Sequence, residues 1–194
     1  AYAPTFEAAL LNKLEYRVPK LLANAVKTAA PKRHFRSVLD LGCGTGLMGP
    51  YLRADADELG GMDLSEAMLQ KAAEKQVYDT LTKGDVNELD APDQSIDLVI
   101  AADVFVYVGD LHRAFTNVAR ALAPDGLFAF SVENHLSDDE LILQPSLRYT
   151  HSESYVRRLL AENSMTLLSL RRETIRLDRG EPLQGLIVVA RPNV

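Results

Sequence analysis

Hydrophobic and polar positions alternate along this chain in a way that predicts one helix, followed by a long series of strands and helices. Near the start, apolar residues recur at spacings of three and four, which places them on one face of a helix within the first 30 residues. These residues are Val18, Leu21, Leu22, Ala25 and Val26. Pro19 is compatible with this helix because proline is tolerated in a first helical turn. The segment 30–34, with Pro31, ends the helix.

From Ser37 onward, short apolar runs alternate with helical patterns, which is typical of a doubly wound parallel sheet. The predicted strands cover residues 38–41, 58–63, 78–83, 96–102 and 127–132. The run 96–102 is almost continuously apolar, as expected for a central parallel strand buried on both faces. Ser65, Asp110 and Ser152 are predicted to begin helices because their side chains can accept a hydrogen bond from the first turn. Residues 124–126 predict a turn, and 133–150 show no regular period.

The end of the chain follows a different pattern. Two strand-like segments, 165–177 and 184–190, are joined by a connection too short to hold a crossover helix. Such a pair predicts an antiparallel hairpin. The predicted fold class is therefore α/β, with a doubly wound, mostly parallel seven-stranded sheet, helices on both faces and a C-terminal antiparallel hairpin. We expect one domain over residues 1–194.

The strongest chemical signal lies where the first predicted strand ends. Gly42, Gly44 and Gly46 stand at alternate positions, which lets the backbone turn sharply and lets a ligand lie against it. Asp40 ends the apolar strand, where an unpaired carboxylate is costly to bury. A cationic or hydrogen-bond-donating ligand would offset that cost. The segment therefore predicts a nucleotide-like cofactor with a positive charge near its reactive centre.

Acidic residues also follow the next two predicted strands. Asp63 comes 17 residues after Gly46, where a carboxylate can accept hydrogen bonds from both hydroxyls of a ribose. Asp85 follows Gly84 and is placed to reach an adenine amino group. Because ligands bind at the carboxyl ends of the strands in open α/β sheets, we expect these carboxylates to converge. The glycine turn also satisfies the G-x-G-x-x-G pattern of dinucleotide-binding proteins at 44–49, so an NAD-linked oxidoreductase stays open as an alternative.

Composition and charge narrow the classes of partner. The 194 residues carry a formal net charge of −6, which argues against tight nonspecific binding to nucleic acid. The single cysteine, Cys43, excludes a disulfide framework and a cysteine-based zinc site, and we expect no metal. No apolar run approaches the roughly 20 residues that cross a bilayer, and the first residues lack the pattern of a secretory signal. We therefore expect a cytoplasmic protein without a membrane partner.

In order and spacing, segments 38–46, 61–65, 84–86 and 95–102 resemble the successive motifs of class I S-adenosylmethionine-dependent methyltransferases. The terminal hairpin resembles the sixth and seventh strands of that family. The resemblance implies S-adenosyl-L-methionine as cofactor and S-adenosyl-L-homocysteine as product. A weaker likeness, carried by 148–152 and 185–190, links the C-terminal third to bacterial methyltransferase domains attached to tetratricopeptide proteins.

The resemblance also divides the single domain. Residues 1–36 would form an N-terminal helical lid, and 37–132 would form the cofactor-binding core. Residues 133–151 would be a substrate-side insertion, followed by the C-terminal helix and hairpin at 152–194. At the lid, we expect Tyr16 and Arg17 to lie near the carboxylate of the cofactor.

Each motif residue receives a role from the resemblance. The expected cofactor-binding residues are Asp40, Gly42, Gly44, Gly46, Asp63, Leu64, Asp85, Val86, Ala102 and Asp103. Asp63 would bind the ribose hydroxyls, while Asp85 and the backbone of Val86 would bind the adenine, whose face Leu64 would cover. Asp40 would help to hold the methionyl ammonium. The glycines would lie against the methionyl part and the ribose, and the last two residues would border the reactive methyl group.

The acceptor side of the predicted site is less defined. Transfer from a sulfonium can be accelerated largely by positioning, and a base is needed only where the acceptor must lose a proton. Candidate catalytic residues are Tyr107, Glu133, His135, Tyr149 and His151.

The acidic charge, together with the absence of an Asn/Asp-Pro-Pro-Tyr/Phe pattern at 101–105, favours a small molecule as acceptor. A protein side chain is the second choice. A non-catalytic domain that binds the cofactor or a partner is a further alternative. The sequence assigns neither the oligomeric state nor the atom that is methylated.

Overall fold

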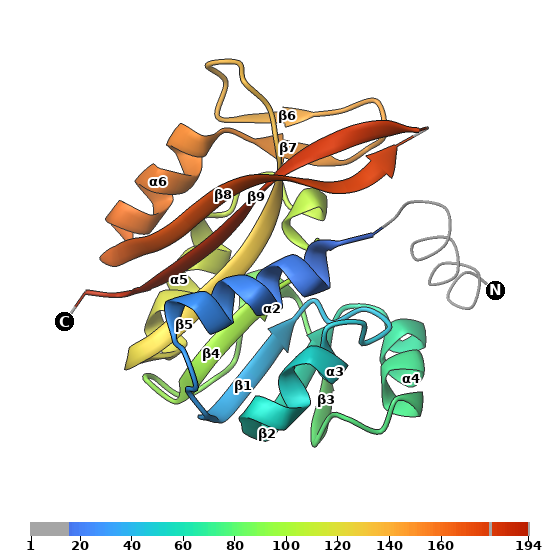
Figure 1. Cartoon of the computed structure of the whole chain (residues 1–194), viewed down its shortest axis with the longest axis vertical. Coiled ribbons are helices and arrows are strands. Elements are labelled where there is room, and N and C mark those ends of the chain that lie inside the picture. Colours follow the sequence, from blue (N-terminus) through green and yellow to red (C-terminus); the bar gives the residue numbers. More distant parts are fainter. Residues whose placement is uncertain (1–15, 179, 194) are drawn as a thin grey trace.

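A computed structural model describes residues 16–178 and 180–193, and these form a nine-stranded sheet with helices on both faces (Figure 1). The strands are β1 (Phe35–Leu41), β2 (Ala56–Asp63), β3 (Thr80–Lys83), β4 (Ile96–Ala101), β5 (Leu122–Asn134), β6 (Leu141–Leu143), β7 (Tyr149–His151), β8 (Met165–Asp178) and β9 (Glu181–Pro192). The α-helices are α2 (Val18–Ala29), α3 (Gly49–Leu52), α4 (Glu66–Glu74), α5 (His112–Ala121) and α6 (Glu153–Glu162). Short 3-10 helices are η1 (Arg53–Asp55), η2 (Val86–Glu88) and η3 (Phe105–Tyr107).

The order of the strands confirms the predicted fold class. Strands β3, β2, β1, β4 and β5 are adjacent in this order and all parallel. Strand β9 runs antiparallel to β5, and β8 runs antiparallel to β9, so the predicted terminal hairpin is confirmed. In Figure 1 this hairpin is the long red pair that extends the sheet beyond β5. The alternation of predicted strands and helices therefore predicts the parallel core, and the structure supplies the order of its strands.

The sheet has nine strands rather than seven because the segment predicted to be irregular contains β6 and β7. These two short strands are antiparallel to each other, and β7 adds to β5 in parallel at Glu133↔Thr150 and Asn134↔His151. Strand β4 pairs with β5 only as far as Ala101↔Phe130, so β5 continues beyond the end of β4. Strands of three residues are too short to produce a recognisable period in the sequence.

The turn predicted at 124–126 is instead an irregularity within β5. Ile96 pairs with Leu122, but Leu98 pairs with Leu127, so the register shifts between these two positions of β4. Such a bulge accommodates a proline, which has no N–H to donate to a neighbouring strand. Gly126 is required beside it, because a Cβ at this position would lie 2.9 Å from the carbonyl oxygen of Ala123.

The predicted helix starts agree with the structure at two positions of three. Ser65 and Ser152 are the N-caps of α4 and α6, and each side chain accepts a hydrogen bond from the first turn. The N-cap of α5 is Leu111 rather than Asp110. The Asp110 carboxylate still accepts a 2.9 Å hydrogen bond from the backbone of His112, so it serves the helix from one residue further out.

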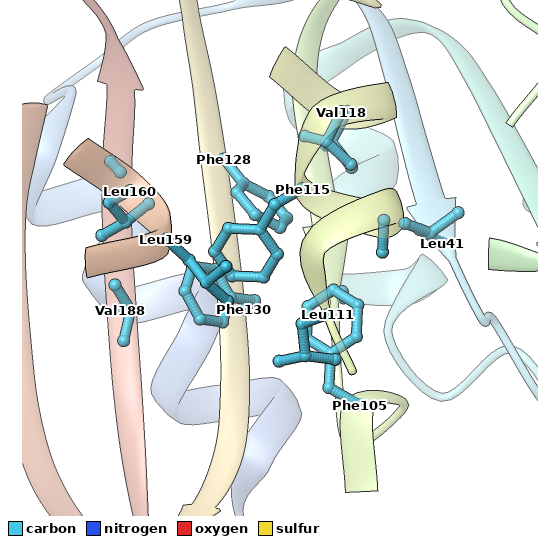
Figure 2. Close-up of a cluster of buried hydrophobic side chains, with 14 of the residues drawn as sticks. Leu41, Phe105, Leu111, Phe115, Val118, Phe128, Phe130, Leu159, Leu160 and Val188 are labelled. Atoms are coloured by element: carbon cyan, nitrogen blue, oxygen red, sulfur yellow. The ribbon is translucent and has the colours of Figure 1, made fainter. Parts of the chain in front are cut away.

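The core consists of two apolar clusters, one on each face of the sheet. Because successive side chains of a strand point to opposite faces, Phe128 and Phe130 join α5 and α6 in one cluster, while Leu127 and Ala129 face α2 and α3 in the other. Figure 2 shows Phe105, Phe115, Phe128 and Phe130 in contact between α5, α6 and the sheet. Both faces of β4 and β5 are thus buried, which explains their nearly continuous apolar sequence.

Helix α2 packs on the sheet as part of this core. Its Val18, Leu22 and Val26 are buried in the same cluster as residues of β1, β5 and β9. The rest of the expected lid helix, residues 1–15, lies outside the described residues. Among the helices that the structure describes, none is both long enough and apolar enough to cross a membrane.

Candidate functional site

A cavity of about 800 Å³ opens at the carboxyl ends of the parallel strands. Its walls are formed by the segments that follow β1, β2, β3 and β4, together with residues further along the chain. These segments are 42–45, 63–65, 84–87, 102–104 and 107–110, joined by Tyr16, Pro19, Asp40, Leu47, Met48, Met68 and Tyr149. The carboxyl ends predicted to converge therefore do so, around a cavity whose volume suits a nucleotide-sized ligand.

Asp40 lies in the floor of this cavity and is almost completely buried. Its Oδ2 accepts a 2.6 Å hydrogen bond from the hydroxyl of Tyr78, whereas its Oδ1 has no hydrogen-bond partner among the described residues. Burial raises the pKa of this carboxyl from 3.8 to about 7, and the hydrogen bond from Tyr78 opposes the rise. A buried carboxylate oxygen without a partner is costly, so Asp40 is suited to receive a donor from a ligand.

The glycine turn after β1 has the left-handed backbone that its sequence predicts. The φ angles of Gly42, Gly44 and Gly46 are 72°, 55° and 81°. A Cβ on Gly42 would lie 2.2 Å from the side chain of Val104, whereas a Cβ on Gly44 would meet nothing within 4 Å. Gly46 is not among the residues that line the cavity, and it packs closely against Tyr78 instead. The glycines therefore differ in their tasks: Gly44 leaves space for a ligand, and Gly46 lets the turn pack.

Asp63, at the end of β2, organises this turn from the neighbouring strand. Its Oδ2 accepts a 2.8 Å hydrogen bond from the backbone N–H of Gly44, and its Oδ1 accepts one of 2.8 Å from that of Ser65. Next to it, Leu64 lines the cavity and is 66% exposed. This leucine presents a flat apolar surface to the cavity.

The third predicted strand contributes Asp85 and Val86. The Asp85 Oδ1 accepts a 2.8 Å hydrogen bond from the backbone of Asn87 and so begins η2. Val86 is buried in the cluster that contains α5, and it also lines the cavity. Both residues line the cavity together with Asp63 and Leu64.

At the other end, Asp103 belongs to a buried network of ion pairs. Its Oδ1 accepts a 2.8 Å hydrogen bond from Arg148, whose Nε donates one of 2.6 Å to Glu133 and whose Nη1 donates one of 2.8 Å to the hydroxyl of Tyr107. Arg176 donates to the same oxygen of Glu133 at 2.9 Å. Burial raises the pKa of Asp103, and the charge of Arg148 opposes that rise. The network joins β5, β8 and the segment after β4 behind one wall of the cavity.

The candidate catalytic residues occupy different places. Tyr107 and Tyr149 line the cavity, whereas His135, His151 and Glu133 do not. The two ring nitrogens of His135 bond to Thr150 and to the carbonyl of Asp139. His151 is fully buried, and its Nε2 lies 2.9 Å from the carbonyl oxygen of Gly109. A ring held in this way supports the loop at 108–110, and the ring itself does not line the cavity.

The two N-terminal residues expected near the carboxylate of the cofactor also lie in different places. Tyr16 lines the cavity, and its hydroxyl has a pKa well above 10.0 because it is buried and because Asp103 and Asp40 are near. The Arg17 guanidinium instead lies 3.4 Å from the carbonyl oxygen of Thr174 and does not line the cavity. Within the described segments, no group of three His, Cys, Asp or Glu side chains could hold a metal ion.

Sequence reasoning did not identify Tyr78 and Arg148 as part of the site. Tyr78 lies 38 residues from the Asp40 to which it donates, and Arg148 lies 45 residues from Asp103. A buried arginine in a segment without a period is a detectable signal, because such a side chain requires carboxylate partners. Its partners become known only from the three-dimensional structure.

The residues fit S-adenosylmethionine on two structural observations. The buried Asp40 Oδ1 and Thr45 Oγ1 both lack a partner in the described part of the chain, at the place where the resemblance puts the methionyl group. The backbone at Gly44 has open space above it, so a ligand can lie directly against the turn. Asp63 and Asp85 add acceptors for hydroxyl and amino groups on the opposite wall.

Comparison with known proteins agrees with this geometry. A family model described as a methyltransferase domain matches residues 39–130, which is the part of the chain that holds the glycine turn and the aspartates. Residues 39–130 are thus a methyltransferase domain, and relatives and solved structures that resemble the chain are named as S-adenosylmethionine-dependent methyltransferases. The cofactor of this methyltransferase domain is S-adenosylmethionine.

Among the relatives of the methyltransferase domain is the malonyl-[acyl-carrier protein] O-methyltransferase of Salmonella typhimurium. It is 34% identical over 109 residues, which are 56% of this chain and 43% of the relative. The probable S-adenosylmethionine-dependent methyltransferase CRG1 of Saccharomyces cerevisiae is 29% identical over 177 residues, which are 84% of this chain and 58% of the relative. The chain thus spans less than two thirds of these relatives.

Solved structures show the same fold as the methyltransferase domain. An S-adenosylmethionine-dependent methyltransferase from Clostridium acetobutylicum superposes with a TM-score of 0.74 at 15% identity, and covers 100% of this chain and 98% of that one. At this level of identity the likeness concerns the fold alone. It includes the C-terminal antiparallel strands, so the fold class rests on the whole described chain.

Proposed function

We propose that this domain transfers the methyl group of S-adenosylmethionine to a small-molecule acceptor by in-line displacement. The observation that carries the proposal is the buried Asp40 oxygen without a partner, in the floor of a cavity bordered by the glycine turn. An ammonium group offers the charge and the hydrogen-bond donors that this carboxylate lacks. The aspartates on the other walls provide the acceptors that an adenosine needs.

We assign each part of the cofactor to the lining residues that can bind it. Asp63 would accept from the ribose hydroxyls, Asp85 and the backbone of Val86 would hold the adenine edge, and Leu64 would cover its face. Asp40 would hold the ammonium, with Ala102 and Asp103 beside the methyl group. Gly42 and Gly44 would allow the close approach of the backbone, while Gly46 would act through packing. When bound, the cofactor supplies a methyl group on a positively charged sulfur, which is already a good leaving group.

The contribution of the chain itself is then to position and enclose the reacting groups. Holding two reactants in line and at contact distance can supply about 7–11 kcal/mol of the barrier without an acid or base. Tyr107 and Tyr149 are the two catalytic candidates that line the cavity, so they are the residues proposed to orient the acceptor. His135 and His151 are proposed to act only on the structure around the site, because neither lines the cavity.

For the acceptor we propose only its chemical class, a small molecule, and no particular compound. Relatives named as malonyl-[acyl-carrier protein] O-methyltransferases show that one branch of related proteins acts on an acyl group carried by a protein. We do not transfer that acceptor to this chain, because the chain spans less than half of those relatives. A protein side chain is the alternative acceptor.

Calorimetric titration tests the cofactor part of the proposal. S-adenosylmethionine and S-adenosylhomocysteine should each bind with one-to-one stoichiometry. Asp63→Ala should weaken S-adenosylhomocysteine binding at least about tenfold, because one substitution removes both the proposed ribose acceptor and the restraint on Gly44. Asp138→Ala, an exposed aspartate that does not line the cavity, is the matched control and should bind like the wild type.

The transfer itself is tested by incubating the protein with S-adenosylmethionine and a metabolite extract, and measuring S-adenosylhomocysteine by mass spectrometry. Product that depends on the extract and is lost in Asp63→Ala supports the enzyme. Binding without product supports a non-catalytic cofactor-binding domain. Failure to bind either compound, or binding of NAD in their place, would refute the proposal.

A further inference from the structure

The acidic and basic side chains that line the cavity are all aspartates. Within residues 16–178 and 180–193, the charged residues on its walls are Asp40, Asp63, Asp85, Asp103 and Asp110, and no lysine, arginine or histidine is among them. A cleft lined by charges of one sign focuses the field and concentrates ligands of the opposite sign. The walls are therefore selective for charge as well as for shape.

Arg148, which contacts the lining residues Asp103 and Tyr107, is already engaged, and so is the neighbouring Arg176. Arg148 is only 9% exposed, and its Nε, Nη1 and Nη2 donate to Glu133, Tyr107 and Asp103 respectively. Arg176 donates to Glu133, and its side chain is 12% exposed. If Arg148 turned towards an anion in the cavity, the buried carboxylates of Glu133 and Asp103 would lose the positive charge that pairs with them, which is costly.

The aspartates divide between two regions of the cavity. In the proposed arrangement, Asp40, Asp63 and Asp85 serve the cofactor. Asp103 and Asp110 remain on the wall that also carries Tyr107 and Tyr149. Asp110 also lines the cavity, and its side chain is 74% exposed and lies 2.6 Å from His112, so it adds negative charge there when His112 is neutral. This second region is the space left for the acceptor.

We propose that the methyl acceptor of this domain is an amine, and that free carboxylates are excluded from the acceptor region. The proposal rests on the proposed function and adds the chemical class of the acceptor. A carboxylate entering the region would be desolvated beside two aspartates whose partners, Arg148 and His112, are already paired with them, whereas an ammonium group would be attracted. A malonyl group offers a free carboxylate as its oxygen nucleophile, so the chemistry proposed here differs from that of the relatives named for it.

The transfer to an amine balances without a further reactant. The ammonium form of the acceptor first loses one proton to bulk water at the open side of the cavity. The nitrogen lone pair then forms the new N–CH₃ bond, while the sulfur keeps the electron pair of the broken S–CH₃ bond and leaves as a neutral thioether. The methylated ammonium product is again a cation, which the acidic wall can hold until it is released.

The first experiment identifies the class of acceptor by its charge. A bacterial small-molecule extract is separated by ion exchange into cationic, neutral and anionic fractions, and each is incubated with the protein and methyl-labelled S-adenosylmethionine. We expect label to enter the cationic fraction, in products that stay stable to mild alkali and that mass spectrometry identifies as N-methyl compounds. Label in the anionic fraction that alkali releases as volatile methanol reveals a methyl ester and overturns the proposal, as does an O-methyl ether from the neutral fraction.

The second experiment does not depend on finding the natural acceptor. The protein is first saturated with S-adenosylhomocysteine, and saturation-transfer NMR then compares phenethylamine, 2-phenylethanol and 3-phenylpropionate, which share one ring and differ in charge. We expect the amine to give the strongest signal and the carboxylate to give none. A carboxylate signal equal to that of the amine, or no amine signal at millimolar concentration, would overturn the proposal.

A variant that removes one negative charge tests whether the aspartates of the acceptor region cause the binding of the amine. Asp110→Asn keeps an oxygen that can accept from the backbone of His112, but it removes the negative charge. We expect this variant to bind phenethylamine about two- to fivefold more weakly, which is the effect of one exposed charge pair. Asp138→Asn is the matched control at a residue that does not line the cavity. Equal affinity in all three proteins would count against the proposal.

The two proposals can fail separately. If S-adenosylhomocysteine does not bind, the proposed function fails before the amine is tested. If it binds and the amine does not, only the class of acceptor is wrong.

Discussion

Tyr78 donates a 2.6 Å hydrogen bond to the Asp40 carboxylate and so fixes the one acidic group that lies deepest in the cavity floor. The bond joins the end of β1 to the segment that precedes β3, and it leaves the second oxygen of Asp40 without a partner in the described residues. One oxygen is thus held by the fold while the other is directed to a ligand. The protonation of this group should therefore be measurable both in stability and in binding.

Asp40 should make the free protein less stable as the pH rises. Burial raises the pKa of its carboxyl from 3.8 to about 7, so between these values the folded state binds more protons than the unfolded state. The resulting contribution is complete below 3.8 and is lost as the pH rises through about 7. Urea unfolding between pH 5 and 8 should show this loss in the wild type and not in Asp40→Asn.

Tyr78→Phe provides a second check on Asp40. The hydrogen bond from Tyr78 lowers the pKa of Asp40, so its removal should shift the loss of stability to higher pH. An unchanged pH profile in Tyr78→Phe would show that another group is responsible.

His151 should have the opposite pH dependence. Burial lowers the pKa of its imidazole below 6.5, and the ring is stacked against Tyr155 at a centroid distance of 5.8 Å. The folded state then binds fewer protons than the unfolded state, so the contribution is present above 6.5 and is lost as the pH falls. His151→Gln should unfold with a weaker dependence on acid than the wild type.

Gly42→Ala should disturb the glycine turn more than a substitution at another left-handed glycine. Gly42 has a φ of 72°, and its new Cβ would lie 2.2 Å from a methyl group of Val104. Gly180 has a φ of 87° but nothing within 4 Å of its Cβ position. Both changes cost backbone strain of about 1–2 kcal/mol, and only Gly42→Ala adds the clash. Thermal unfolding and S-adenosylhomocysteine titration should therefore show a loss of both stability and binding in Gly42→Ala, while Gly180→Ala keeps its affinity.

The strands and helices of the core could be predicted because each repeats a simple pattern. The run of apolar residues at β4 and the capping serines before α4 and α6 are local signals, and the structure agrees with them. Strands β6 and β7 could not be predicted, since three residues carry no period and their pairing depends on β5 continuing beyond β4. Local sequence patterns therefore predict long elements, but they do not predict short strands that form only because they pair with a neighbouring strand.

The residues of the site also fall into those that local sequence patterns predict and those that only the packing reveals. The sequence placed Asp40, Asp63 and Asp85 around one cavity because each follows a parallel strand, and the carboxyl ends of such strands converge. It did not separate Gly46 from the other glycines, because only the packing of Tyr78 shows that this residue faces away from the cavity lining. His135 and His151 were predicted as candidates because histidine often acts in catalysis. The residue that organises their segment is instead Arg148, which bonds to Glu133 and Asp103.

Arg148→Met should destabilise the protein strongly, because it removes the cation between Asp103 and Glu133. Both carboxylates are nearly buried, with side chains 11% and 3% exposed, and breaking a buried pair by removing one partner costs about 3–5 kcal/mol. Arg176 still compensates Glu133 at 2.9 Å, so Asp103 carries most of the loss. The control is Arg158→Met, whose partners Glu140 and Glu162 are about half exposed and whose removal should cost at most about 1 kcal/mol. Urea unfolding of the two variants measures the difference, and equal losses would show that the buried network contributes no more than a surface pair.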